Sequence, residues 1–228
     1  GTENTAWVRT QLANLYFNSG DLERAEQEYQ LTLQSRPNYV YALAGLGRVR
    51  FAQGKIEEAI ELLNQAVGIM PIPEFVITLG ELYESAGRQD AAQQQYDLLA
   101  AIETLHRANG VDMDMEIALF NADHDRNLAE TVQLAREAYT HRPSIHGADV
   151  LAWALYKTGN YKDAQAYSEE ALQLGTKDPL KLFHAGMIAL ALGEKEEARM
   201  YLEEALSINP HFSILYTEEA TRTLETLK

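Results

Sequence analysis

The sequence predicts an all-α solenoid of about six antiparallel helix hairpins, stacked one after another along the chain. The first observation behind this prediction is a repeat. Intervals of 34, 33, 39, 33 and 34 residues separate six small side chains, Ala25, Ala59, Ala92, Thr131, Ala164 and Ala198. The second observation is a glycine between the two halves of most units. Because one hairpin of this length cannot bury its apolar face alone, the hairpins must stack, and function then belongs to the surface of the stack.

The first unit, residues 6–38, contains the features that define each hairpin. Gly20 ends its first helix, and Asp21 can cap the second. The second helix stops before Pro37, since the residue before a proline avoids the helical conformation. The same order of residues recurs in two further units, at 40–72 and 73–109.

The fourth unit, residues 111–143, departs from this pattern. Thr131 replaces the alanine, and Arg126 stands where glycine is usual. The longer interval before this unit implies about five additional residues. Because Gln89 to Asn109 contains no helix breaker, we expect the additional residues to extend the second helix of the third unit. Two regular units follow, at 145–178 and 179–210.

The last segment, residues 212–228, places apolar side chains on one helical stripe and charged side chains elsewhere. We expect a capping helix with a polar outer face here, as an open stack requires at its end. No matching cap precedes Trp7, so the first helix should expose an apolar edge suited to upstream repeats or to self-association. The whole chain, residues 1–228, is predicted to form one array.

The second unit shows the order of large, small, glycine, alanine and proline positions most completely, as Leu46, Gly47, Gly54, Ala59, Leu63, Ala66 and Pro71. In this order the chain resembles the tetratricopeptide repeat family, and the resemblance covers nearly the whole chain. The resemblance implies a right-handed superhelix that acts as a scaffold for protein–protein interaction. Three runs, at 112–125, 144–156 and 209–212, also resemble the C-terminal half of longer bacterial proteins of the family, which leads us to expect further repeats before Gly1.

In that family the first helix of each unit lines a concave groove, so the repeat register indicates which side chains face a partner. Aromatic side chains in such a groove can anchor a partner segment, while scattered charges set its register. The candidate partner-binding residues are Asn14, Phe17, Tyr41, Arg48, Phe51, Glu81, Phe120, His124, His146, Asp149, Trp153 and Tyr156. For each aromatic residue, packing against a neighbouring helix is the alternative.

Some members of the family grip the C-terminal carboxylate of a peptide with a set of basic and amide side chains. Asn14 matches one position of that set, whereas Thr10, Gly45, Glu74 and Thr78 do not. We therefore do not expect such a clamp. A second hypothesis for the chain is a structural assembly or spacer module of a longer protein, acting through its uncapped N-terminal edge.

Composition restricts the partners. The formal net charge is −15, from 34 acidic and 19 basic side chains, which repels nucleic acid and favours a neutral or basic protein or peptide. Without cysteine there is no disulfide and no thiolate metal site. The longest apolar run, Ala185 to Leu192, is too short to cross a bilayer, so we expect no membrane insertion. Cytoplasmic and extracytoplasmic locations are both compatible with the sequence.

The sequence offers one weak candidate for chemistry, a group formed by His124, His146 and Asp149 from adjacent units. A hydrolase-like or metal-binding site at this group is the least favoured hypothesis, because no nucleophile, metal or phosphate-binding motif accompanies it. Asp112, Asp114 and Glu116 alternate, and residues two apart on a helix do not share a face, so they would not converge on one ion. We therefore expect no catalytic residue, no metal and no cofactor.

Overall fold

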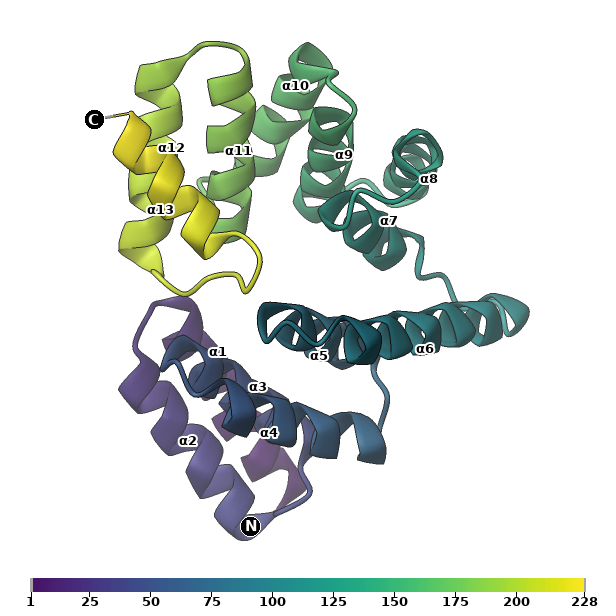
Figure 1. The fold of residues 1–228 in the computed structure, drawn as a ribbon, viewed down its shortest axis with the longest axis vertical. Coiled ribbons are helices and arrows are strands. Elements are labelled where there is room, and N and C mark those ends of the chain that lie inside the picture. The colour runs from purple at the N-terminus through teal and green to yellow at the C-terminus, as the bar shows by residue number, and fades with distance from the viewer. Residues whose placement is uncertain (1, 228) are drawn as a thin grey trace. The chain divides into compact units, whose positions relative to one another are not determined.

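The computed structural model describes residues 2–227, and within this range it contains α-helices and no strand (Figure 1). The prediction of an all-α fold is thereby confirmed. The helices are α1 (Glu3–Asn18), α2 (Leu22–Ser35), α3 (Val40–Ala52), α4 (Ile56–Ile69), α5 (Pro73–Ser85), α6 (Gln89–Ala108), α7 (Asp114–Asp123), α8 (Leu128–His141), α9 (Ile145–Lys157), α10 (Tyr161–Leu172), α11 (Pro179–Ala191), α12 (Lys195–Ile208) and α13 (Thr217–Thr226). No helix in this range is both long enough and apolar enough to span a membrane.

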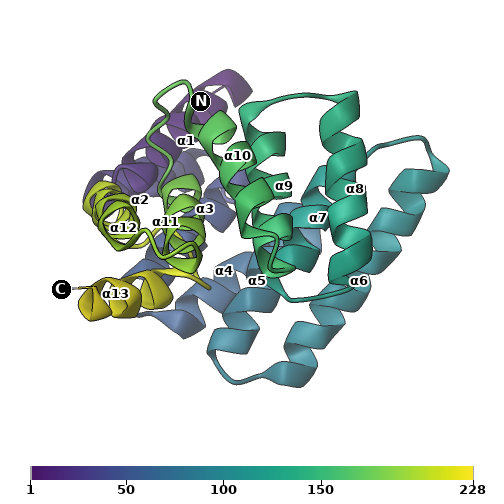
Figure 2. The same ribbon diagram turned by 90° about the horizontal axis from the view of Figure 1, so that it is seen from above.

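Consecutive helices form antiparallel pairs, as the ribbons in Figure 1 and Figure 2 show. Helices α1 and α2 pack against each other, and so do the equivalent later pairs that begin with α3, α7, α9 and α11. Each of the second helices α2, α4, α8 and α10 also packs against the first helix of the next pair. This alternation of contacts within and between pairs is the arrangement of a helical repeat solenoid.

The contacts divide the chain into two compact units, which are described separately below. Unit 1 consists of Gly1–Leu105 with Ser213–Leu215, and unit 2 consists of His106–Phe212 with Tyr216–Lys228. Helix α6, with 20 residues, is the longest of the second helices, which otherwise have 12 to 14 residues.

The turn inside the first hairpin shows why the sequence places glycine there. Gly20 has a φ of 80°, a left-handed conformation in which a side chain is strained. Its N–H donates to the carbonyl of Phe17, and the N–H of Asp21 donates to that of Tyr16, so the last carbonyls of α1 are satisfied. The Asp21 carboxylate then accepts from the N–H of Arg24 at 3.1 Å and caps α2.

A second glycine allows two helices to approach closely in unit 1. A Cβ atom placed at Gly45 of α3 would overlap the ring of Tyr29 from α2, so no larger residue fits without moving that ring. Tyr29 is completely buried and belongs to a core cluster with Ala25, Ala42 and Leu46. The junction between the first two hairpins is therefore set by a ring against a glycine.

The fourth hairpin makes its turn without glycine. The left-handed residues there are Asp125, with a φ of 52°, and Asn127, with a φ of 43°, while Arg126 lies between them. Aspartate and asparagine tolerate this conformation better than other non-glycine residues. Arg126 can therefore stand at the usual glycine position, because its two neighbours adopt the left-handed conformation that the turn requires.

The capping helix starts later than predicted. The sequence placed it at 212–228, whereas α13 begins at Thr217. The residues before it form a turn, in which Asn209 Oδ1 accepts from the N–H of His211 and Ser213 Oγ accepts from the N–H of Leu215. Side chains that bond the backbone locally in this way compete with helix formation.

We predict that Asn127→Ala lowers the free energy of unfolding by about 1 kcal/mol, because alanine is strained in the left-handed conformation. Asn127→Gly should leave the stability unchanged or raise it. Urea unfolding followed by circular dichroism measures both variants. Equal stabilities of the alanine and glycine variants would show that the backbone at this turn is not strained.

Candidate functional site

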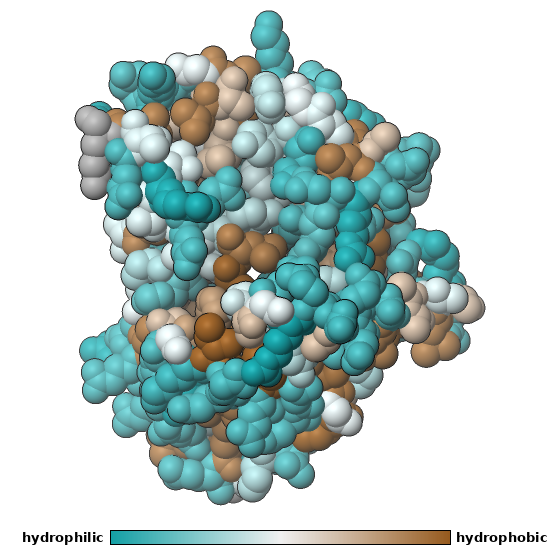
Figure 3. Space-filling view, viewed as in Figure 1, coloured by the Kyte–Doolittle hydropathy of each residue, from teal (hydrophilic) through white to brown (hydrophobic). Residues whose placement is uncertain are grey.

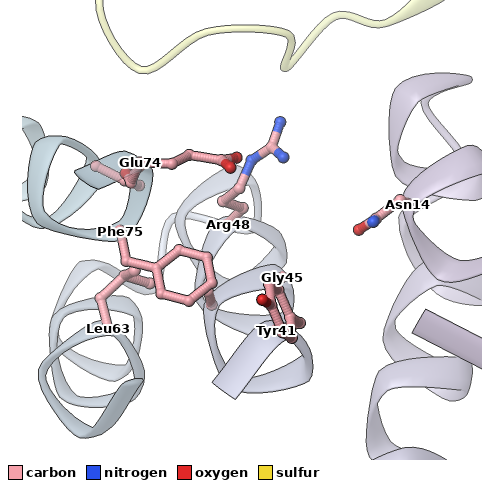
Figure 4. A pocket seen from close by; sticks show the side chains of 9 residues that line it. Asn14, Tyr41, Gly45, Arg48, Leu63, Glu74 and Phe75 are labelled. Carbon is pink, nitrogen blue, oxygen red and sulfur yellow. The ribbon is translucent and has the colours of Figure 1, made fainter. Parts of the chain in front are cut away.

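A pocket in unit 1 is lined mainly by residues from the first helices of three successive hairpins, with one residue from the second helix α4 (Figure 4). It contains about 450 Å³ of space, part of which is open solvent. Helix α1 supplies Asn14, and the remaining lining residues come from α3, α4 and α5: Tyr41, Ala44, Gly45, Arg48, Leu63, Glu74, Phe75 and Thr78. The stacking of the hairpins therefore creates the pocket.

The side-chain amide of Asn14 is held in one orientation. Its Oδ1 accepts a hydrogen bond from the hydroxyl of Tyr29 at 2.6 Å. Burial raises the pKa of Tyr29 to about 12, so this hydroxyl stays protonated and remains a donor at neutral pH. Because Oδ1 is occupied, the Nδ2 group of Asn14 is left to donate to a ligand in the pocket.

Two opposite charges stand at the rim of the pocket. The guanidinium carbon of Arg48 lies 4.3 Å from the ring centroid of Phe17, a cation–π contact that fixes the arginine. Arg48 forms no ion pair with any residue between 2 and 227. Figure 4 shows the head groups of Arg48 and Glu74 extending toward each other above the aromatic side chains. The rim thus offers both a donor and an acceptor.

Aromatic rings form one wall of the pocket. Tyr41 is 47% exposed, and its ring meets Phe75 edge-on with centroids 5.7 Å apart. Tyr39 lies at the same centroid distance on another side of Tyr41. A large, partly exposed ring that neighbouring rings hold in place offers contact area at a low cost in conformational entropy.

The remaining sequence candidates of unit 1 lie outside the pocket lining. Phe17 is 3% exposed, with Arg48 above its ring. Phe51 packs partly buried against the core of unit 1, and Glu81 is half-buried in α5. Of the unit 1 candidates, the structure brings Asn14, Tyr41 and Arg48 together.

The candidate list omitted six of the nine residues that line the pocket, and two of them, Glu74 and Phe75, bear on its chemistry. The repeat register carried a signal for Glu74, because it lies 33 residues after Tyr41 and thus at the equivalent position of the next hairpin. The sequence gives no such signal for Phe75, because its side chain packs in the core and also lines the pocket.

Unit 2 places its candidates differently. Asp149 and Trp153 are each only 2% exposed, so they belong to the interior and do not offer a surface to a partner. The indole N–H of Trp153 donates to Asp123 Oδ1 at 2.8 Å, and the hydroxyl of Tyr216 donates to the same oxygen at 2.7 Å. One carboxylate therefore joins α7, α9 and the start of α13.

A buried histidine that the sequence analysis did not select lies at the centre of this network. His184 is fully buried, and its Nδ1 lies 3.0 Å from Asp149 Oδ1. The ring of Trp153 stacks on His184 at a centroid distance of 4.2 Å and on Tyr156 at 4.7 Å. His184 is adjacent in sequence to Phe183, which the repeat register placed on the inner face, and this adjacency was the available signal.

Asp149 is thus paired with His184, and not with the histidines that the sequence analysis grouped with it. His146 is exposed, and His124 is half-buried with its ring 4.6 Å from that of Phe120. Phe120 itself is 5% exposed and belongs to the core. Between residues 2 and 227 no group of three or more His, Asp or Glu side chains is arranged to hold a metal ion.

Burial dominates the electrostatics of the unit 2 network. Burial raises the pKa of Asp123, while the nearby His184 and the hydrogen bonds from Tyr216 and Trp153 oppose this increase. Burial also raises the pKa of Tyr216, with the charge of Asp123 as the next contribution, so Tyr216 stays a donor. The network is therefore a structural connection that holds the capping helix to the repeats.

Comparisons with known proteins agree on the architecture. The family model described as tetratricopeptide repeat matches residues 10–71 and 150–211, which together make up more than half of the chain. The CTR9 homolog of Arabidopsis thaliana is 25% identical over 218 residues, covering 92% of this chain and 20% of that protein. Cellulose synthase 1 operon protein C of Komagataeibacter xylinus is 37% identical over 97 residues, covering 42% of this chain and 7% of that protein. The chain spans a fifth or less of the length of these relatives.

Solved structures share the fold at low sequence identity. A tetratricopeptide repeat protein from Parabacteroides merdae superposes with a TM-score of 0.62 and 18% identity, covering 100% of this chain and 86% of that one. The type IV pilus biogenesis factor PilW superposes with a TM-score of 0.52 and 20% identity, covering 100% and 99%. Identities at this level establish a common fold alone.

We predict that Asp123→Ala lowers the free energy of unfolding of unit 2 by about 2–4 kcal/mol, because two buried donors lose their acceptor. Asp123→Asn keeps an acceptor oxygen and should cost less. The exposed neighbour change Asp125→Asn, which removes a surface ion pair with Lys157, is the control and should cost under about 1 kcal/mol. In a Trp7→Phe background, fluorescence of Trp153 during urea unfolding reports on unit 2.

The same variants give a pH test. Because the folded state raises the pKa of Asp123, its protonated form is favoured on folding, and stability from this group is lost as pH rises through the raised pKa. The unfolding free energy of the wild type relative to Asp123→Asn should therefore fall between acidic and neutral pH. A difference that stays constant or increases over this range contradicts a raised pKa.

Proposed function

This chain belongs to the tetratricopeptide repeat family, and we propose that it is a scaffold whose unit 1 holds a segment of a partner protein in the pocket between α1, α3 and α5. Proteins of this family and fold typically act as non-enzymatic scaffolds for protein interaction. The observation that carries the proposal is the convergence of three hairpins on one pocket that contains an arginine without an ion pair within residues 2–227.

The chemistry of the pocket suits a peptide segment. A peptide backbone presents carbonyl acceptors and N–H donors in alternation, and its side chains present apolar or charged groups. The Asn14 amide and the Arg48 guanidinium are donors, and the Glu74 carboxylate is an acceptor. The Tyr41 and Phe75 rings supply apolar area for a side chain between these polar groups.

Charge supports a neutral or basic partner. The net charge of −15 gives the chain an acidic field that attracts basic segments and slows the approach of acidic ones. Figure 3 shows hydrophilic residues over much of the face that it displays, with hydrophobic residues between them. The same field disfavours nucleic acid as the partner.

The proposal is confined to unit 1 because in unit 2 two residues at inner positions of the repeats, Trp153 and Phe183, are already covered by a side chain from beyond the last repeat, Tyr216. Trp153, Phe183 and Tyr216 pack together there, with Phe183 and Tyr216 stacked at a centroid distance of 4.8 Å. An apolar partner side chain would have to displace these rings. Unit 1 contains a pocket whose aromatic ring, Tyr41, is already exposed.

We predict that peptides selected from a displayed library on the wild-type chain are neutral or basic and bind in the unit 1 pocket. Asn14→Ala, Tyr41→Ala and Arg48→Ala should each weaken such a peptide at least tenfold, about 1.4 kcal/mol, in calorimetric titrations. Arg222→Ala in α13 removes the same charge from an exposed helix of unit 2 and is the matched control.

Circular dichroism should show unchanged helicity in all four variants, since none of the substituted side chains is fully buried. Selected peptides that bind the three pocket variants as tightly as the wild type would place binding elsewhere on the chain. An acidic consensus among the peptides would contradict the electrostatic part of the proposal.

A further inference from the structure

Helix α1 exposes an apolar stripe. Val8, Leu12 and Leu15 are 56%, 36% and 66% exposed and follow one another at spacings of four and three residues, which places them on one face of the helix. The two charged side chains of this helix are paired within their own hairpin, Arg9 with Glu28 and Glu3 with Arg36. The stripe therefore consists of apolar surface without a charge of its own.

The later hairpins show what such a stripe does in this fold. The repeat intervals of 34 and 33 residues give the equivalent positions in α3 and α5. All six residues at these positions are 0 to 6% exposed: Ala42, Leu46, Val49, Phe75, Leu79 and Leu82. The α1 stripe is thus exposed at positions whose equivalents in α3 and α5 are buried.

The second helix of the preceding hairpin covers each of these equivalent stripes. Helix α2 packs against α3, and α4 packs against α5. In the second of these junctions the covering side chains come from Ala59, Leu63 and Ala66, which belong to one core cluster with Leu79 and Leu82. The covering surface is therefore an amphipathic helix with small residues on either side of a leucine.

A polar contact accompanies each of these junctions. Arg50 of α3 pairs with Glu26 of α2 at 2.7 Å, and the Tyr83 hydroxyl of α5 accepts from Asn64 Nδ2 of α4 at 2.7 Å. Tyr16 occupies the equivalent position in α1, and its hydroxyl has no hydrogen-bond partner among residues 2–227. The surface of α1 thus carries both the apolar stripe and the polar group that α3 and α5 use to pack against a preceding helix. Residues 2–227 contain no preceding helix for α1.

We propose that the exposed stripe of α1 docks a partner helix of the same type as α4, with small residues and a leucine on one stripe and a glutamate or asparagine at its edge. A second copy of this chain is not the occupant, for two reasons. Five of its six second helices, α2, α4, α8, α10 and α12, are each covered by the helix that follows. In the sixth, α6, the residues equivalent to Ala59, Leu63 and Ala66 of α4 are Ala92, Tyr96 and Leu99, which are 1 to 3% exposed and therefore already buried. In addition, two chains with a net charge of −15 repel each other.

A stapled peptide of residues 55–70 tests the proposal. The staple joins positions 61 and 65, which are exposed in α4, and keeps the isolated helix folded. The labelled peptide should bind the full chain saturably in fluorescence anisotropy. Leu15→Glu should weaken binding at least tenfold, whereas Leu174→Glu, at a leucine that is 76% exposed in unit 2, should leave it unchanged. A peptide carrying Leu63→Glu should not bind.

Three results would overturn the proposal. Absence of saturable binding, or equal binding by the wild type and the Leu15→Glu variant, means that the stripe does not accept such a helix. Sedimentation of the chain alone completes the test. A concentration-dependent dimer that Leu15→Glu abolishes would make a second copy the occupant.

Discussion

The close packing of each second helix against the next first helix is the constraint on which the rest of unit 1 depends. Tyr29 shows this most clearly, because its ring lies against Gly45 while its hydroxyl orients Asn14. A larger residue at Gly45 would displace the ring, and the amide would lose the bond that orients it. Core packing and the pocket are therefore not separable: the residue that sets the distance between hairpins also sets the direction in which the pocket donates a hydrogen bond.

Unit 2 has the same architecture, but its inner side chains are packed against one another. Its inner positions carry the buried carboxylate of Asp149, the half-buried carboxylate of Asp123, a buried histidine and several stacked rings, and Tyr216 connects this group to the capping helix. Buried charges are costly unless their hydrogen bonds are satisfied, so a network of this kind specifies one arrangement of neighbouring helices. The surface that could have received a partner is instead used to fix the end of the stack.

Repeat spacing was sufficient to predict the helix pairs and three residues of the pocket, because a regular stack places equivalent positions on the same surface. It could not predict that Asp149 and Trp153 are buried. The ring of Trp153 packs against Tyr216, which follows the last repeat and has no equivalent in the register, and Asp149 is paired with His184 of the next hairpin. His184 was missed for a related reason: a register that assigns helix faces contains no information about a hydrogen bond between two hairpins. The left-handed conformations of Asp125 and Asn127 were not predicted, because the sequence pattern expects one glycine at this turn, whereas two polar residues share that role.

Helix α1 links the two surfaces that we assign to unit 1. Asn14 faces the pocket, while Leu12 and Leu15, from the same turns of the helix, belong to the exposed stripe. Unlike α3, α1 has no preceding hairpin within residues 2–227, so fewer contacts restrain it. A helix bound to the stripe adds the missing restraint, and it thereby reduces the conformational freedom that a peptide in the pocket must otherwise remove. Because linkage is reciprocal, a peptide in the pocket that orders α1 then favours docking on the stripe by the same free energy.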